Sequence, residues 1–233
     1  MIEISIVTVA FNAERTIKET LISVQAMLDA GVVHEYIVVD GASTDQTLAL
    51  VSQFSPSAIV VSEPDKGIYD AMNKGVALAT GDYVHLLNAD DSYCIEPEIF
   101  SQHLSLIERD VLSFDVDYVL TENRTDRLFF NGILVDTAPH PGLIVKKSLY
   151  EKYPFDLSYR FAADIDFMLR ALSPSIITRI PIVLVKMASG GAGGTTESVK
   201  EAASIYWKRK QYRRWVHCQL SILKLRVKRC LSR

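Results

Sequence analysis

The chain has 233 residues, 48% of them hydrophobic, which is enough to build the core of one large α/β domain. The formal net charge is −3, and no apolar run approaches the roughly 18 to 20 residues that span a membrane. The N-terminus lacks the basic start and small-residue cleavage site of a signal peptide, so we expect a cytoplasmic protein.

The first predicted element is an apolar strand from Ile2 to Val9. A helix follows through about residue 30, with four apolar residues at helical spacing: Ile17, Leu21, Val24 and Leu28. The turn between them, residues 10–14, contains no glycine. A dinucleotide-binding Rossmann unit needs a glycine-rich turn there, because its backbone must approach a pyrophosphate closely. The sequence therefore argues against a dinucleotide-binding protein of the Rossmann class.

A second strand, from Tyr36 to Val39, ends at Asp40. A carboxylate at this strand end can accept hydrogen bonds from a ribose hydroxyl or from a base N–H group. The helix that follows, to about Phe54, can be capped by Ser43, Thr44 or Asp45.

A third strand, from Ala58 to Ser62, leads into a charged turn and a helix N-terminus. Asp65 can cap this helix, and Lys66 can meet either a phosphate or a neighbouring acid. Both interpretations of the turn stay open.

The stretch that follows places side-chain oxygens at the end of a buried strand. The helix is predicted from four apolar residues on one face, Ile68, Met72, Val76 and Ala79, and Gly81 ends it. The run from Tyr83 to Leu87 is apolar apart from His85, as expected for a strand buried on both faces.

Asn88, Asp90 and Asp91 follow at the carboxyl end of this strand, where open α/β sheets bind ligands. Two carboxylates and an amide oxygen suit Mg2+ or Mn2+, and such a cation suits a diphosphate. The alternative is that these residues simply form a turn and cap the next helix.

From residue 92 the pattern becomes more antiparallel. We predict a helix from about Glu96 to Ile107 and strands over 111–121 and 127–135 around a polar turn. A short strand from His140 to Val145 and a short helix from Lys147 to Tyr153 come next.

A helix from Ala162 to Leu172 carries Asp164 and Asp166 near its start. Carboxylates in a first helical turn also stabilise the helix dipole, so position alone does not assign them a function. Strand structure is predicted from Ile176 to Lys186, with Pro181 at an edge or bulge.

The last part of the chain is flexible and then basic. Residues 189–196 are glycine-rich and can form a lid, a hinge or a plain linker. Residues 200–233 hold 11 of the 25 Lys and Arg residues but only one of the 28 acids, Glu201. Apolar residues recur at helical spacing from residue 198, which predicts one or two amphipathic helices. Such a tail either docks on a membrane surface or packs on the protein's own body.

Five motifs in order carry a family resemblance: SIVTVAFN, VVDGASTDQT, SEPDKGIYDAMNKGVALATGDYVHLLNADD, HPGLIVKKSLYEKYPFD and YRFAADIDFMLRAL. Together they resemble the inverting family-2 glycosyltransferases of bacterial polysaccharide synthesis. The resemblance covers about residues 2–190, and the third motif matches nearly position by position.

The resemblance implies the GT-A fold, a Rossmann-like, mostly parallel central sheet flanked by helices. Residues 1–190 would form the glycosyltransferase domain, with a nucleotide-binding half to about residue 91 and an acceptor-binding half from about residue 92. Residues 191–233 would add the Gly-rich loop and the basic amphipathic helical tail.

The implied activity is hexosyl or N-acetylhexosaminyl transfer from a nucleotide-sugar, a UDP-sugar, to a glycan or lipid-linked acceptor. Mn2+ or Mg2+ would neutralise the leaving diphosphate while a carboxylate takes the acceptor proton. The transfer would be a single displacement that inverts the anomeric configuration of the sugar. Contact of residues 198–233 with the inner face of the cell membrane would suit a lipid-linked acceptor.

On the donor side, the resemblance implies that Asp40 recognises the base and that Asn88 and Asp90 stand at the DxD metal motif. Asp90 and Asp91 are the expected metal-site residues, with Asp90 binding the metal and Asp91 close by. The expected nucleotide-sugar-binding residues are Asp40, Asp65, Lys66, Asn88 and Asp90.

On the acceptor side, the resemblance implies that Asp164 is the catalytic base and that His140 lies beside the acceptor or the metal. Three positions depart from the family pattern: Asn88 replaces the first acid of DxD, Ala163 stands where many relatives have Glu, and Ala42 where many have Gly.

A non-catalytic nucleotide-sugar-binding module is the alternative from a different class, and Asn88 and Ala163 favour it. A nucleotidyltransferase is a weaker alternative, because AFNAERT lacks the Gly- and Arg-rich loop that would hold a triphosphate. A nucleic-acid partner is not expected, because the body of the chain is acidic.

Overall fold

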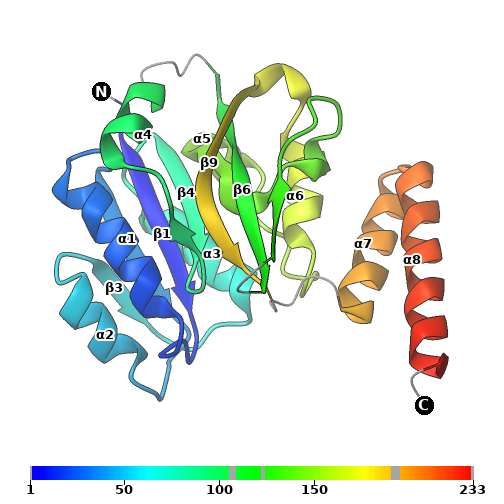
Figure 1. The fold of residues 1–233 in the computed structure, drawn as a ribbon, viewed down its shortest axis with the longest axis horizontal. Coiled ribbons are helices and arrows are strands. Elements are labelled where there is room, and N and C mark those ends of the chain that lie inside the picture. Colours follow the sequence, from blue (N-terminus) through cyan, green and yellow to red (C-terminus); the bar gives the residue numbers. More distant parts are fainter. Residues whose placement is uncertain (1, 105–108, 122–123, 190–194, 232–233) are drawn as a thin grey trace.

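The structure is a computed structural model that describes residues 2–104, 109–121, 124–189 and 195–231, with side chains described up to residue 223 in the last helix. Its described strands form one nine-stranded sheet in the order β3-β2-β1-β4-β8-β6-β9-β5, with β7 paired to β6 (Figure 1). Helices cover both faces of this sheet, so the predicted α/β class is confirmed.

The first half of the chain forms the parallel part of the sheet. Its strands are β1 (Ile4–Ala10), β2 (Glu35–Asp40), β3 (Ile59–Ser62) and β4 (Tyr83–Asn88). The helices between them are α1 (Ile17–Asp29), α2 (Thr47–Phe54) and α3 (Ile68–Leu78). All seven elements confirm the sequence prediction within about two residues.

Alternation along β1 divides the core into two layers. Ile4 and Ile6 pack with α1 on one face, while Val7 and Val9 pack with α3 on the other. Along β4, Val84 and Leu86 face the α3 layer and Leu87 faces the α1 layer. The prediction that this strand is buried on both faces is therefore confirmed.

The buried face of α3 differs from the prediction at one position. Met72, Val76 and Ala79 are buried as expected, but Ile68 is 42% exposed and Tyr69 takes its place in the core. Ile68 is the first helical residue and lines a cavity instead.

The second half of the chain continues the sheet with antiparallel pairs. β8 (Leu143–Lys146) runs antiparallel to β4 and to β6 (Val111–Thr121). β9 (Ile177–Ala188) runs parallel to β6, and β5 (Ser92–Tyr93) runs antiparallel to β9. The predicted change of pattern after residue 91 is confirmed.

The strand predicted over residues 127–135 is wrong in its second part. β7 (Arg124–Leu128) ends early, and residues 135–137 form a 3-10 turn, η1. Asn131 explains the break, because its side-chain oxygen accepts the N–H groups of Ile133 and Leu134, both at 2.9 Å. Gly132 between them has φ +81°, a left-handed conformation that glycine adopts without strain.

Pro181 lies in an irregularity of β9, as predicted. Phe114 of β6 stands opposite Ile180, but the next residue, Asp115, stands opposite Val183, so Pro181 belongs to a bulge.

Shorter helices and turns connect these strands: α4 (Pro97–Leu104), η2 (His140–Gly142), α5 (Lys147–Lys152), α6 (Ala163–Ala171) and η3 (Pro174–Ile176). The end of the predicted helix over 96–107 and part of the polar turn after β6 lie outside the described residues.

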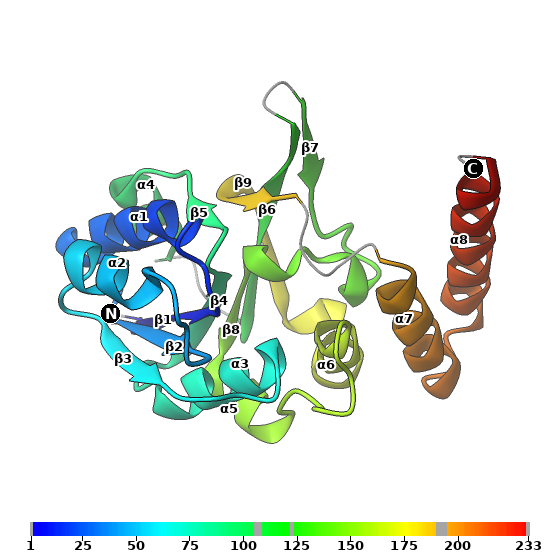
Figure 2. The same cartoon turned by 90° about the horizontal axis from the view of Figure 1, so that it is seen from below.

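The tail forms two helices in sequence within the described residues, α7 (Thr196–Lys208) and α8 (Tyr212–Leu231). Figure 2 shows α7 beside α6, with α8 on the outer side of α7. Ala202, Ala203, Ile205 and Tyr206 of α7 are buried in the main core. In the described part of the chain, none of the helices combines the length and the hydrophobicity needed to cross a membrane. Most of the predicted glycine-rich stretch lies outside the described residues.

Candidate functional site

A cavity of about 840 Å3 opens at the carboxyl ends of β1 and β4. Its lining comes from both halves of the chain, since it includes the start of α3 as well as η2 and the start of α6. Six residues predicted from the sequence line it: Asp65, Asn88, Asp90, Asp91, His140 and Asp164. The lining does not include Asp40 or Lys66, as far as the described residues show.

Asn88, the last residue of β4, is oriented by Asp91. The Asn88 side-chain Nδ2 donates to Asp91 Oδ2 at 3.1 Å, and Asp91 Oδ1 accepts the backbone N–H of Ala188 at 3.2 Å. Asn88 Oδ1 is buried and finds no hydrogen-bond partner among the described residues. Asp90, between them in sequence, is exposed.

Acidic side chains are crowded at this point of the cavity. Burial, together with the charge of Asp90, raises the pKa of Asp91 to about 7. Although Asp90 is exposed as a residue, partial desolvation of its carboxylate by the surrounding cavity raises its pKa as well. A bound cation would relieve this crowding of negative charge.

The oxygens of Asn88 and Asp90 fit a hard divalent cation. Asn88 Oδ1 is an acceptor without a partner in the described part of the chain, and Asp90 offers a carboxylate beside it. Both Asp91 oxygens are already engaged, so Asp91 holds the amide in place. Within the described ranges, His, Cys, Asp and Glu residues form no group of three that could hold a metal. Such a site therefore needs water and ligand oxygens to complete it, which is usual for Mg2+.

Asp164 is the second residue of α6, is half-buried and lines the same cavity. Its Oδ1 accepts a hydrogen bond from the Tyr69 hydroxyl at 3.0 Å. Burial, reinforced by the charge of Asp164, raises the pKa of Tyr69 well above its ordinary value, so this hydroxyl stays protonated and donates. The hydrogen bond couples α3 of the first half to α6 of the second.

His140 lies at the start of η2, beside Phe155, with the two ring centroids 6.4 Å apart. Its Nε2 is buried and is unpaired within the ranges that the structure describes. Burial lowers the pKa of His140, and the carboxylate of Asp164 only opposes this shift, so the ring is neutral at neutral pH.

The sequence reasoning missed the roles of Tyr69 and His85. His85 Nε2 donates to the Pro141 carbonyl at 2.8 Å, while Nδ1 accepts from the hydroxyl of Tyr93. Burial lowers the pKa of His85 to about 4, so it is neutral and ties η2, and with it His140, to β4. The sequence did contain a sign of the role of His85, because it is the one exception in the apolar run from Tyr83 to Leu87.

Asp40 is fully buried at the end of β2. Its Oδ2 accepts from the backbone N–H of Ser43 at 2.9 Å and from the hydroxyl of Ser62 at 2.6 Å. Its Oδ1 lacks a partner in the part of the chain that the structure describes. The prediction that Ser43, Thr44 or Asp45 caps the next helix is wrong in position, because the cap residue of α2 is Gln46; Asp45 still accepts the N–H of Thr47, the first helical residue, at 3.0 Å.

Asp65 lies between the end of β2 and the cavity. Its Oδ1 accepts the N–H of Gly67 at 2.8 Å. A Cβ on Gly41 would approach Asp65 Oδ2 to 2.5 Å, so only glycine allows this carboxylate so close to the strand end. Lys66 is exposed, and its backbone N–H is bonded to Asp70.

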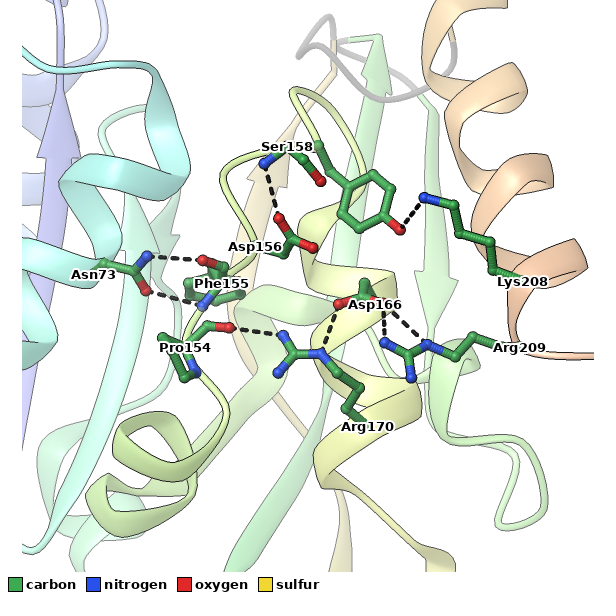
Figure 3. Close-up of polar contacts among 10 residues, drawn as sticks. Asn73, Pro154, Phe155, Asp156, Ser158, Asp166, Arg170, Lys208 and Arg209 are labelled. Atoms are coloured by element: carbon green, nitrogen blue, oxygen red, sulfur yellow. Dashed lines mark hydrogen bonds and ion pairs between the residues drawn. The ribbon is translucent and has the colours of Figure 1, made fainter.

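Asp166 has different surroundings from Asp164. It is 1% exposed and forms ion pairs with Arg170 at 2.6 Å and with Arg209 of α7 at 2.7 Å (Figure 3). It does not line the cavity that the described residues form. Asp166 therefore joins α6 to the tail.

Comparison with known proteins identifies the family. The profile of glycosyl transferase family 2 matches residues 5–155. A PGL/p-HBAD biosynthesis glycosyltransferase of Mycobacterium bovis is 35% identical over 167 residues, which are 65% of this chain and 63% of that protein. An uncharacterized glycosyltransferase of Mycobacterium tuberculosis is 32% identical over 208 residues, 83% of this chain and 78% of the relative. The chain belongs to glycosyl transferase family 2.

Solved structures show the same GT-A architecture. TarS of S. aureus in complex with UDP has a TM-score of 0.70 at 19% identity, covering 94% of this chain and 69% of that one. Glucosyl-3-phosphoglycerate synthase of Mycobacterium tuberculosis, in complex with Mn2+, UDP and glucosyl-3-phosphoglycerate, has a TM-score of 0.65 at 19% identity, covering 89% and 80%. The predicted GT-A fold is confirmed.

Proposed function

We propose that this protein is an inverting glycosyltransferase that moves a sugar from a nucleotide-sugar, a UDP-sugar, to a glycan or lipid-linked acceptor. The observation that carries the proposal is one cavity whose lining brings Asn88 and Asp90, at the end of β4, together with Asp164, at the start of α6. Two relatives named for biosynthesis support this class of activity, the PGL/p-HBAD biosynthesis glycosyltransferase of Mycobacterium bovis and the amylovoran biosynthesis glycosyltransferase AmsB of Erwinia amylovora.

Residues 1–91 form the nucleotide-binding half in this proposal. The free Oδ1 of Asp40 accepts an N–H group of the base or a ribose hydroxyl, because a buried carboxylate oxygen gains most from a donor. Asp65 and Lys66 lie on the path from Asp40 to the cavity and contact the donor. The UDP complexes of the structural neighbours support a uridine nucleotide.

Asn88 and Asp90 would hold Mn2+ or Mg2+, which when bound would neutralise the charge of the leaving diphosphate. The Mn2+ in the synthase complex supports this choice. Asp90 contributes the negative charge of the site, and Asp91 fixes the Asn88 amide by accepting its NH2 group, which leaves the amide oxygen without a partner in the described residues.

Residues 92–190 form the acceptor-binding half and supply the base. Asp164 takes the proton of the acceptor hydroxyl as that hydroxyl attacks the sugar, and the Tyr69 hydrogen bond holds the carboxylate in position. Neutral His140, with its unpaired Nε2 beside this acid, orients the acceptor by hydrogen bonding.

We further propose that α8 docks on the inner face of the cell membrane and brings a lipid-linked acceptor to the cavity. Four apolar residues, Tyr212, Val216, Leu220 and Leu223, are about half exposed and lie at helical spacing on one face. Basic residues such as Lys210 and Arg213 flank this stripe, and each contributes up to ~1 kcal/mol near an anionic lipid surface.

A thermal-shift panel of UDP-, GDP- and dTDP-sugars, with and without Mn2+, tests the donor class. We expect UDP-sugars to raise Tm only with the metal present. Slow release of UDP without any acceptor distinguishes an enzyme from a binding module. A protein that binds UDP-sugars but releases no UDP with any glycan or lipid acceptor would be such a module.

A further inference from the structure

Glu201 of α7 holds the loop that leads into α6. Its carboxylate accepts three consecutive backbone N–H groups, those of Arg160 at 2.8 Å, Phe161 at 2.6 Å and Ala162 at 2.8 Å. These contacts span about forty residues of sequence. Glu201 is also the one acid among the basic residues 200–233, which makes it unusual in its own segment.

The start of α6 has no nearby side chains of its own that could accept these backbone N–H groups. The cap position is Ala162, which has no polar side chain, and the third helical residue is Ile165, which cannot reach back to the cap N–H as Glu does in a capping box. The N–H groups before α6 therefore depend on an acceptor from elsewhere in the chain. Charge-assisted hydrogen bonds of this kind are about twice as strong as neutral ones.

The loop that Glu201 holds is part of the cavity wall. Arg160, Phe161 and Asp164 all line the cavity, and Asp164 is only two residues after Ala162. The position of the Asp164 carboxylate therefore depends on where this loop is held.

Other contacts keep α7 itself in place. Arg209 pairs with buried Asp166, and Lys208 Nζ donates to the Tyr159 hydroxyl at 3.1 Å (Figure 3). The Tyr206 hydroxyl donates to Asp136 at 2.7 Å. The helix is thus anchored at its C-terminal end, and Glu201 acts from a fixed support.

We propose that Glu201 is a positioning residue for Asp164, and that α7 is therefore a working part of the acceptor side of the site. The proposal rests on the proposed function, in which Asp164 is the base. Removing the carboxylate releases three N–H groups and lets the start of α6 move. Displacements of about 1 Å at a reacting group can cost ~100-fold in rate.

The test compares Glu201→Gln and Glu201→Ala with a matched control, Glu197→Gln. Glu197 lies one turn earlier on α7 and is exposed, so the control removes the same charge without touching the loop. Turnover is measured as UDP released from UDP-glucose or UDP-GlcNAc, whichever gives the larger thermal shift. We expect Glu201→Ala to lower kcat ~10- to 100-fold with little change in the KM for the donor, Glu201→Gln to retain part of kcat, and the control to match the parent.

Two further measurements separate positioning from general stability. In the Asp164→Asn background, Glu201→Ala should lower kcat less than about twofold further, because both changes act on one group. Arg209→Gln loosens α7 without removing the three hydrogen bonds. It should lower Tm, while its loss of kcat should be smaller than that of Glu201→Ala. Equal kcat losses for Arg209→Gln and Glu201→Ala, or full additivity with Asp164→Asn, would refute the positioning role.

Hydrogen exchange tests the contact without turnover. The amides of residues 160–162 should be protected in the parent protein and exchange faster in Glu201→Gln. Faster exchange in that variant would support the hydrogen bonds from these amides to Glu201. If Asp164→Asn nevertheless kept normal turnover, the contact would be supported but Asp164 would not be the base. Unchanged exchange would contradict the contact whatever Asp164 does.

Discussion

The sharpest test of the proposed chemistry is Asp164→Asn. Asp164 Oδ1 already accepts the Tyr69 hydroxyl at 3.0 Å, so Oδ2 is the atom available to take the acceptor proton. In the variant, the amide oxygen can keep the Tyr69 hydrogen bond while the NH2 group replaces Oδ2. The fold and the hydrogen bond are then retained, and only the ability to accept a proton is lost.

The expected loss follows from what a general base contributes. Such assistance is typically worth 10²- to 10⁴-fold, or about 3–5 kcal/mol in the activation free energy. We therefore expect kcat to fall by ~10²-fold or more, while the Kd for UDP with Mn2+ is unchanged, because the proposed metal site uses Asn88 and Asp90 and not Asp164.

The assay measures UDP release at saturating donor and acceptor, with calorimetry for UDP binding and NMR for the anomeric configuration of the product. Asp156→Asn is the matched control, because it removes the same charge from an exposed acid in the loop before α6. The Asp156 carboxylate bonds locally, accepting the N–H of Ser158 at 2.9 Å (Figure 3). Near-normal transfer by Asp164→Asn, or a product that retains the configuration of the donor, would refute the single-displacement mechanism.

Three variants and one truncation test the remaining assignments. Asp90→Ala should abolish turnover and make UDP affinity independent of Mn2+; a metal response that persists would exclude Asp90 as a ligand. Asp40→Ala should weaken UDP binding ~10-fold or more in calorimetry, because a hydrogen bond to a charged group contributes about 1.5–3 kcal/mol, and unaltered binding would make Asp40 only a turn former. Asp166→Asn should lower unfolding stability by ~1–3 kcal/mol in a urea titration and leave kcat largely unchanged, because Asp166 bonds to Arg170 and Arg209 outside the cavity; a loss of kcat without a loss of stability would contradict this. A chain ending at Lys208 keeps α7 but lacks α8, and should fail to float with vesicles containing anionic lipid while the full chain floats; equal flotation would exclude α8 as the contact.

The parallel half of the fold could be predicted because its signals are local. Each strand there is an apolar run, each helix has a stripe of apolar residues, and Asp40 and Asn88 mark strand ends directly in the sequence. Burial on both faces of β4 followed from the same composition. The failures were also local, since the turn made by Asn131 and Gly132 interrupts a segment whose β-propensity alone favours a strand.

The second wall of the site could not be predicted in the same way. The Tyr69–Asp164 hydrogen bond joins residues 95 apart, and Glu201 bonds to a loop about 40 residues away. Periodicity describes which face of an element is apolar, but it does not say which elements meet. The tail shows the same limit, because α7 and α8 share one amphipathic pattern. Ala203 and Ile205 of α7 are buried in the core, whereas α8 buries Cys218 and Ile222 and leaves a second set of apolar residues about half exposed.

Asn88 shows how a departure from a family pattern can have a structural reason. An acid at this position would place a second carboxylate about 3 Å from buried Asp91, and two like charges there would raise each other's pKa. The amide donates to Asp91 instead, so the contact stabilises both groups. Its oxygen stays without a partner among the described residues, and in the proposed metal site Asp90 supplies the charge. With fewer charges from the protein, the proposed metal depends more on the diphosphate oxygens, so metal and donor should bind together rather than in sequence.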